Sequence, residues 1–165
     1  MLKNKYSQAG EAATALILEV FRLNGRLLAA GDRLVAPLGL TSARWQVLGA
    51  IALSPTPEPV ARLARVMGLN RQGVQRIVNE LAQESIVSFR DNPHHRRAKL
   101  VVLTAKGSKA YEAASRLQAP WVEALSAGLD VDAMVAAIRL VEMLRQRLDN
   151  AANADNGKGR EDSFA

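Results

Sequence analysis

The sequence of 165 residues contains no cysteine and only two histidines, which are adjacent at positions 94 and 95. The missing thiols exclude disulfide bonds and cysteine-based zinc sites, and two histidines are too few to predict a metal site. Long apolar runs are also missing, because no stretch approaches the ~18 residues of a membrane-spanning helix. The first residues lack a signal peptide's hydrophobic run, so we expect a cytoplasmic protein with no membrane partner.

Signatures of catalysis are scarce as well. The sequence shows no cysteine nucleophile, no histidine and carboxylate at suggestive spacing, and no glycine-rich phosphate loop. The short segments that contain glycine and proline instead fit the ends of helices. We therefore expect no enzyme and no cofactor.

Positive charge is concentrated in the middle of the chain. Of the 22 basic and 16 acidic residues, residues 40–105 hold nine basic and four acidic ones. Eight of these nine basic residues are arginine, whose planar donor fork suits phosphates and base edges. Charge alone leaves two interpretations open, a nucleic-acid partner or a solvated basic surface.

Two long helical stretches flank this basic segment. Apolar residues at steps of three and four predict a helix from about Gln8 that ends near Pro37-Leu38-Gly39. A similar stripe covers residues 131–148, in a last helix that begins at Asp130 or Asp132. The stripes of residues 16–35 and 131–148 are broad enough to pack on a second subunit, or to form a helical core within one chain.

Two features interrupt the helical pattern of the C-terminal half. Pro120 lies inside the helix that starts after Thr104, so we expect a kink or a break near Ala119. From about residue 150 the composition turns to Asn, Asp, Gly and Lys, which predicts a disordered tail over residues 150–165.

The central segment has the pattern of three short helices followed by a hairpin. Thr41 or Ser42 begins a helix, a proline-rich loop follows over residues 54–59, and Gly68 ends the next helix. Asn70 is a good N-cap for a helix to about residue 85 that turns Val74, Ile77, Val78 and Leu81 inward. Apolar runs at residues 86–90 and 100–103 then flank a basic tip, which predicts a β-hairpin.

This order of elements predicts a helix-turn-helix followed by a wing. The DNA major groove admits one α-helix, and Arg, Gln and Asn side chains read its base edges. A solvated face of an amphipathic helix is the alternative, but a basic hairpin beside it favours DNA because both features can face one duplex. The candidate DNA-binding residues are Asn70, Arg71, Gln72, Gln75, Arg76, Asn79, Arg96 and Arg97.

Three patches between Leu40 and Gly107 resemble the MarR (multiple antibiotic resistance regulator) family of bacterial winged-helix transcription regulators. They are Leu40-Thr41 with Trp45, Val47 and Leu48; Val60-Ala61-Arg62-Leu63-Ala64 through Gly68-Leu69 with Val74, Arg76 and Leu81; and Arg90 to Arg97 with Leu103-Thr104 and Gly107. The sequence departs from the family pattern in the wing, where Asn92 and His95 stand at two positions that are usually acidic. It also has Ser85 where the family tends to place a glycine.

The resemblance implies a mainly α fold with a small β-hairpin wing, in which a winged helix-turn-helix is flanked by dimerisation helices. Residues 40–104 would form the DNA-binding domain, and residues 8–39 and 105–149 the helical dimerisation region. The homodimer would place the helix from Asn70 in the major groove and Arg96 or Arg97 in the minor groove of a pseudo-palindromic operator.

The resemblance also implies a small-molecule effector, held between the dimerisation helices and the winged domain. Arg44 and Trp45 are the candidate pocket residues, although Trp45 equally fits an ordinary core aromatic. The alternative to a sequence-specific DNA-binding regulator is a winged-helix module for protein–protein assembly without specific DNA binding.

Overall fold

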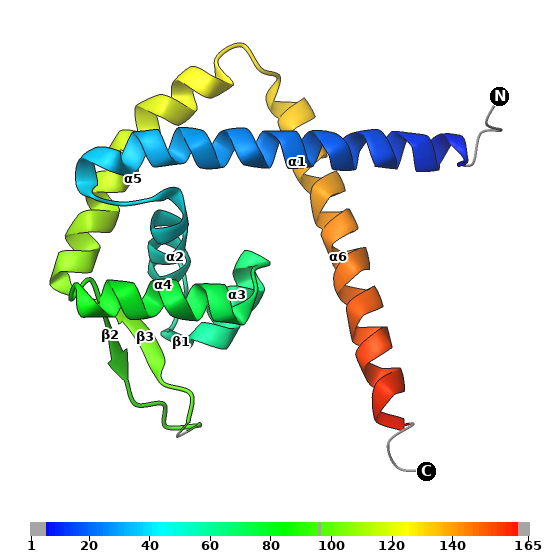
Figure 1. Cartoon of the computed structure of the whole chain (residues 1–165). Helices are drawn as coiled ribbons and strands as arrows, with labels where there is room; N and C mark the ends of the chain where they lie inside the picture. Colours follow the sequence, from blue (N-terminus) through cyan, green and yellow to red (C-terminus); the bar gives the residue numbers. More distant parts are fainter. Residues whose placement is uncertain (1–5, 96, 162–165) are drawn as a thin grey trace. The chain divides into compact units, whose positions relative to one another are not determined.

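The computed structural model of the chain describes residues 6–95 and 97–161. It is mainly helical with one small sheet (Figure 1), as the sequence predicts. The chain divides between Trp121 and Val122 into two compact units. Over the described residues, no helix combines the length and the apolar character that a membrane crossing requires.

Helix α1 (Gln8–Val35) begins at Ser7, whose hydroxyl accepts a hydrogen bond from the Gly10 amide. It is followed by one turn of 3-10 helix, Ala36–Leu38. Near its end, α1 is joined to α2 (Ser42–Ala52) by a 2.6 Å hydrogen bond from the Ser42 amide to the Asp32 carboxylate. Gly31 is buried at the same place, where a Cβ atom would lie 2.7 Å from the Ser42 hydroxyl oxygen. The glycine therefore permits the close approach of the two helices.

The winged helix-turn-helix follows with the predicted helices and one additional strand. Its elements are β1 (Glu58–Pro59), α3 (Val60–Met67), α4 (Arg71–Gln83), β2 (Val87–Arg90) and β3 (Leu100–Leu103). The strands form an antiparallel sheet in the order β1-β3-β2 (Figure 1). The prediction of a plain loop over residues 54–59 is therefore wrong at its end, because Glu58 and Pro59 pair with Val101 and Leu100.

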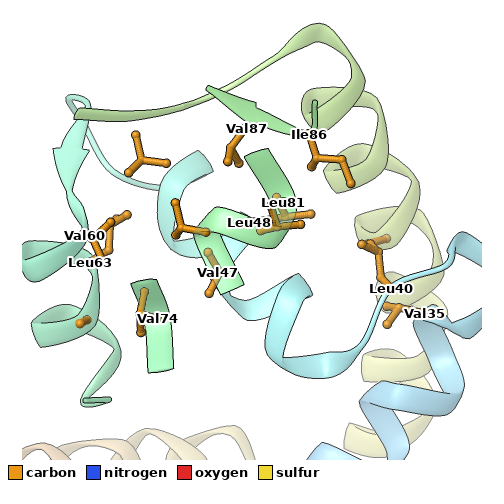
Figure 2. Close-up of a cluster of buried hydrophobic side chains, with 14 residues drawn as sticks. Val35, Leu40, Val47, Leu48, Val60, Leu63, Val74, Leu81, Ile86 and Val87 are labelled. Carbon is orange, nitrogen blue, oxygen red and sulfur yellow. The ribbon is translucent and has the colours of Figure 1, made fainter. Parts of the chain in front are cut away.

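One apolar core holds α2, α3, α4 and the hairpin together. Leu48 of α2, Leu63 of α3 and Leu81 of α4 are essentially inaccessible to solvent. Figure 2 shows the side chains of this cluster converging from separate elements. Since the core contacts one face of α4 only, the opposite face of that helix is left for other partners.

The ends of α3 and α4 have the same hydrogen-bond pattern but different residues in the left-handed position. At the end of α3, Gly68 has φ +65°, and its amide and that of Leu69 donate to Arg65 and Ala64. At the end of α4, Ser85 has φ +57°, with amide bonds from Ser85 to Ala82 and from Ile86 to Leu81. This C-terminal motif normally employs glycine, because a Cβ atom is strained at positive φ.

Replacing Ser85 with glycine is expected to raise the free energy of unfolding by about 0.5–1 kcal/mol, since the strain in the left-handed region is removed. The matched control is Gly68→Ser, which introduces the same strain at the end of α3 and is expected to lower the free energy of unfolding by about 1 kcal/mol. Urea denaturation followed by circular dichroism measures both changes. A loss of stability in the Ser85→Gly variant would contradict this account.

Helix α5 (Ala105–Ser126) begins at Thr104, whose hydroxyl accepts a hydrogen bond from the Gly107 amide at 3.1 Å. The helix continues through Pro120, so of the two expected outcomes near Ala119, a kink or a break, the break does not occur. Proline removes one amide donor from the ladder, but the neighbouring hydrogen bonds suffice to carry the helix on to Ser126.

Helix α6 (Val131–Glu161) begins after Asp130, whose side chain accepts a hydrogen bond from the Asp132 amide. Of the two predicted starting residues, Asp130 is therefore the cap. The structure continues α6 to Glu161, whereas composition predicts disorder over residues 150–165. Helix propagation adds a hydrogen bond with each residue, and Ala151 and Ala152 are strong helix formers. The predicted tail over residues 162–165 lies outside the described residues.

Candidate nucleic-acid interface

The outer face of α4 presents polar side chains because its inner face is fixed by three buried residues. Val74, Val78 and Leu81 are buried at intervals of four and three residues, which places them on one side of the helix. Arg71, Gln72, Arg76, Asn79, Glu80 and Gln83 are exposed, and Gln75 is half-buried. Together these seven residues line a shallow hollow along α4. The polar face that the sequence predicts is thus a continuous surface.

The side chains of this face are partly ordered by contacts with one another. The Gln75 amide donates a 2.9 Å hydrogen bond to the side-chain oxygen of Asn79, one turn further along. The Arg76 guanidinium is 3.9 Å from the Glu80 carboxylate and remains largely exposed. Such an exposed ion pair contributes little to stability, so Arg76 can exchange Glu80 for another negatively charged group at little cost.

Asn70 is the N-cap of α4. Its side-chain oxygen accepts a 2.7 Å hydrogen bond from the Gly73 amide. Asn70 therefore stabilises the start of α4 through this oxygen, in addition to its predicted contact with DNA. Its position at the start of α4 also holds the neighbouring Arg71 at the N-terminal end of the helix, where backbone amides favour anions.

The wing and α4 converge on one site. A hollow of about 240 Å³ is lined by Arg71 and Gln75 of α4 and by Phe89, Arg97 and Lys99 of the hairpin. Residues 59–61 and 98 complete its walls. Three cations from two separate elements therefore surround one depression. Lys99 and Phe89 are additions to the predicted site, and no local sequence signal marks them, since only the hairpin fold brings them to α4.

The wing tip is closed by Asn92, one of the two residues that depart from the family pattern. Its side-chain nitrogen donates to the Ala98 carbonyl, and its side-chain oxygen accepts from the His94 amide, both at 3.0 Å. A carboxylate at this position could accept the hydrogen bond from His94 but could not donate one to Ala98, so asparagine makes one hydrogen bond more than aspartate would. Arg97 is exposed beside this turn. Arg96 lies outside the described residues, and its DNA contact stays a prediction.

A third hollow, of about 380 Å³, lies among α1, α2 and the part of α5 up to Trp121. Trp45 lines it, but Arg44 does not. The two candidate pocket residues therefore do not both line this hollow. Arg44 instead places its guanidinium nitrogen Nη2 2.6 Å from the Glu84 carboxylate. The structure adds Tyr111, Gln118 and Trp121, which are too distant in sequence from Trp45 for any motif to indicate them.

Metal ligands are not clustered in the described part of the chain. No group of three or more His, Asp or Glu side chains lies there in an arrangement that could hold a metal ion.

Comparison with known sequences adds independent information. The sequence model of the MarR family matches residues 38–98. An uncharacterized protein of Mycobacterium tuberculosis is 40% identical over 98 residues, which make up 59% of this chain and 67% of that protein. The transcriptional activatory protein BadR of Rhodopseudomonas palustris is 26% identical over 154 residues, covering 92% of this chain and 86% of BadR.

Solved structures share the fold over most of the chain. The M. tuberculosis transcriptional regulator MOSR, determined in complex with DNA, superposes with a TM-score of 0.67 at 24% identity over 80% of this chain and 96% of its own. Staphylococcus aureus MarR, determined with salicylate and kanamycin, gives a TM-score of 0.71 at 15% identity over 85% of this chain and 94% of its own. At these identities the two structures bear on the fold alone.

Proposed function

Since the chain belongs to the MarR family of DNA-binding, winged-helix transcription regulators, we propose that it is a cytoplasmic homodimer that binds a pseudo-palindromic DNA operator and responds to a small molecule. The observation that carries the DNA-binding proposal is the hollow shared by α4 and the wing. Arg71 and Gln75 from the helix and Arg97 and Lys99 from the hairpin line it together. One duplex laid against that face would contact both elements.

In this proposal α4 enters the major groove. Its exposed Arg, Gln and Asn side chains have the donor and acceptor groups that distinguish base pairs there. Arg71 and the N-terminal end of α4 are suited to phosphates. Arg97 and Arg96 are assigned to the neighbouring minor groove, where a narrow A·T-rich segment attracts arginine. A protein of the same fold, MOSR, was determined in complex with DNA.

A second subunit is proposed because α1 leaves apolar side chains uncovered within its own unit. Ile17, Leu18, Phe21 and Leu23 are exposed, and 68% of the Phe21 residue surface is accessible to solvent. In the second unit, α6 independently exposes most of the apolar stripe that the sequence predicts, including Val131, Ile138 and Leu148. Large apolar patches of this kind are typical of interfaces.

The test begins by selecting fragments of the native genome that bind the purified protein, followed by gel-shift titration on a recovered fragment. Arg76→Ala is expected to weaken binding roughly 5- to 150-fold, which is the usual effect of losing a contact to a base. Arg97→Ala is expected to weaken binding and to reduce the dependence of log affinity on log salt by about 1.

The matched control is Arg22→Ala on α1. Its guanidinium is also exposed and also pairs with a carboxylate of its own helix, Glu19 at 3.1 Å. This variant is expected to bind DNA as the parent protein does. If Arg76→Ala and Arg97→Ala both retain the parent's affinity, the proposed interface is wrong. If the parent protein shows no salt-sensitive DNA binding, a protein–protein assembly module becomes the better interpretation.

A further inference from the structure

The hollow among α1, α2 and α5 has the size and walls of a small-molecule site. Its volume of about 380 Å³ lies within the usual range for ligand pockets, and apolar and aromatic side chains form much of its surface. The lining residues are Asn24, Leu27, Leu28, Gly31, Ser42, Trp45, Gln46, Gly49, Leu53, Tyr111, Gln118 and Trp121.

The lining contains hydrogen-bonding groups but no charge. None of these twelve residues, all within the described part of the chain, is Asp, Glu, Lys, Arg or His. Polar groups come instead from amides such as Gln46 and Gln118, from the Ser42 and Tyr111 hydroxyls, and from the indoles. Amides and hydroxyls can both donate and accept, so they match uncharged polar substituents.

The cation closest in sequence to Trp45 is used elsewhere. The Arg44 guanidinium pairs with Glu84, and its Nη1 donates to the Gly39 carbonyl at 3.5 Å. Only 16% of the Arg44 side chain is exposed, so it is held in that position.

The N-terminus of α2 does not supply a positive site either. The Ser42 amide donates to the Asp32 carboxylate at 2.6 Å, and the Arg44 amide donates to the Thr41 hydroxyl at 3.2 Å. A carboxylate of the protein thus already occupies the end of the helix where an anionic ligand would otherwise bind. Its negative charge, next to the lining residue Ser42, disfavours a second anion there.

We propose that this pocket binds an uncharged aromatic molecule with hydroxyl, carbonyl or amide substituents and discriminates against aromatic carboxylates. The inference rests on the effector response in the proposed function and assigns its ligand class. Trp45, Tyr111 and Trp121 provide faces and edges for an aromatic ring. A carboxylate would lose water in this pocket without gaining a cation, whereas a carboxamide of the same shape would keep its hydrogen bonds.

The experiment compares 4-hydroxybenzamide with 4-hydroxybenzoate, which differ only in the amide and the carboxylate. Both tryptophans of the chain line the pocket, so the change in tryptophan emission of the full-length protein reports occupancy. The dissociation constant for the benzamide is expected to be at least about tenfold lower than that for the benzoate. Equal affinity, tighter binding of the benzoate, or no saturable change with either compound overturns the proposal.

A variant that adds a positive charge to the pocket tests whether the missing cation is the reason for weak benzoate binding. Gln118→Arg places a cation in the lining and is expected to tighten benzoate binding at least about tenfold. The control is Gln8→Arg, which adds the same charge roughly 24 Å along α1 from Asn24. If Gln118→Arg does not fold, Gln46→Arg repeats the test from an exposed position on α2. An unchanged benzoate affinity in the folded variant contradicts the assignment.

The two proposals fail separately. DNA affinity is measured without either compound, and compound binding is measured without DNA. Loss of the proposed DNA interface would therefore leave the benzamide titration unchanged, and failure of the ligand class would leave the gel shift unchanged.

Discussion

Replacing Gly107 with alanine is expected to lower the free energy of unfolding by about 3 kcal/mol or more, because the new methyl group would overlap backbone. A Cβ atom on Gly107 would lie 2.0 Å from the Ile86 carbonyl oxygen. That carbonyl also accepts hydrogen bonds from the amide and the hydroxyl of Thr104, both at 3.1 Å. Moving it away would disturb the junction between the start of α5 and the strand after α4.

The measurement is urea denaturation of Gly107→Ala beside Gly49→Ala. Gly49 is also in a helix, but its added Cβ would meet only Tyr111 Cε2 at 3.8 Å, which is an ordinary contact. Alanine is favoured over glycine in helices, so the control is expected to keep or gain stability, by up to about 1 kcal/mol. Equal stability of the two variants would show that the close contact between Gly107 and the Ile86 carbonyl does not contribute to the stability of the fold.

Leu81→Ala is expected to lower the free energy of unfolding by about 2–5 kcal/mol, because it leaves a cavity beneath α4. The Leu81 side chain has no solvent exposure and belongs to the cluster that holds α4 to α2 and the hairpin. Its carbonyl also accepts the Ile86 amide at the end of the helix. Weaker DNA binding is expected at temperatures where the variant begins to unfold.

The matched control for this prediction is Leu53→Ala, since Leu53 is 77% exposed. Truncating an exposed side chain typically changes stability by no more than about 0.5 kcal/mol. Thermal and urea denaturation of the two variants give the comparison. If the two variants were equally stable, Leu81 would not be needed to hold α4 against the core.

The helices of the winged domain could be predicted from sequence because their determinants are local. Apolar periodicity fixes the inner face of α4, and Asn70 and Thr104 mark helix starts by side chains that reach amides three residues ahead. The polar face of α4 follows from the same periodicity. These features need no knowledge of the rest of the chain.

Strand β1 could not be predicted in this way. It has two residues, one of them proline, and it exists only because Glu58 and Pro59 lie beside Val101 and Leu100. A segment of two residues has no period to detect. The structure extends α6 over residues 150–161, where composition predicts disorder, because an established helix can extend through residues that would not begin one.

The site itself was predictable where it lies on one element and not where it joins several. Gln72, Arg76 and Asn79 follow from the geometry of α4. Lys99, by contrast, comes beside Arg71 and Gln75 only through the hairpin. The pocket draws on residues from Asn24 to Trp121, so Trp45 could be identified as a candidate but its neighbours could not. The ion pair that directs Arg44 to Glu84 instead of this hollow is a contact between helices, which sequence alone does not indicate.

Glu84, the C-terminal cap of α4, contacts two neighbouring helices. Its carboxylate binds Arg44 of α2, and its carbonyl accepts a 2.8 Å hydrogen bond from the Lys106 ammonium of α5. Helices α2 and α5 are also two of the three walls of the tryptophan-lined pocket. Under the proposed function, a ligand that changes the separation of α2 and α5 would act on these two contacts, and through them on the end of the helix that is proposed to enter the major groove.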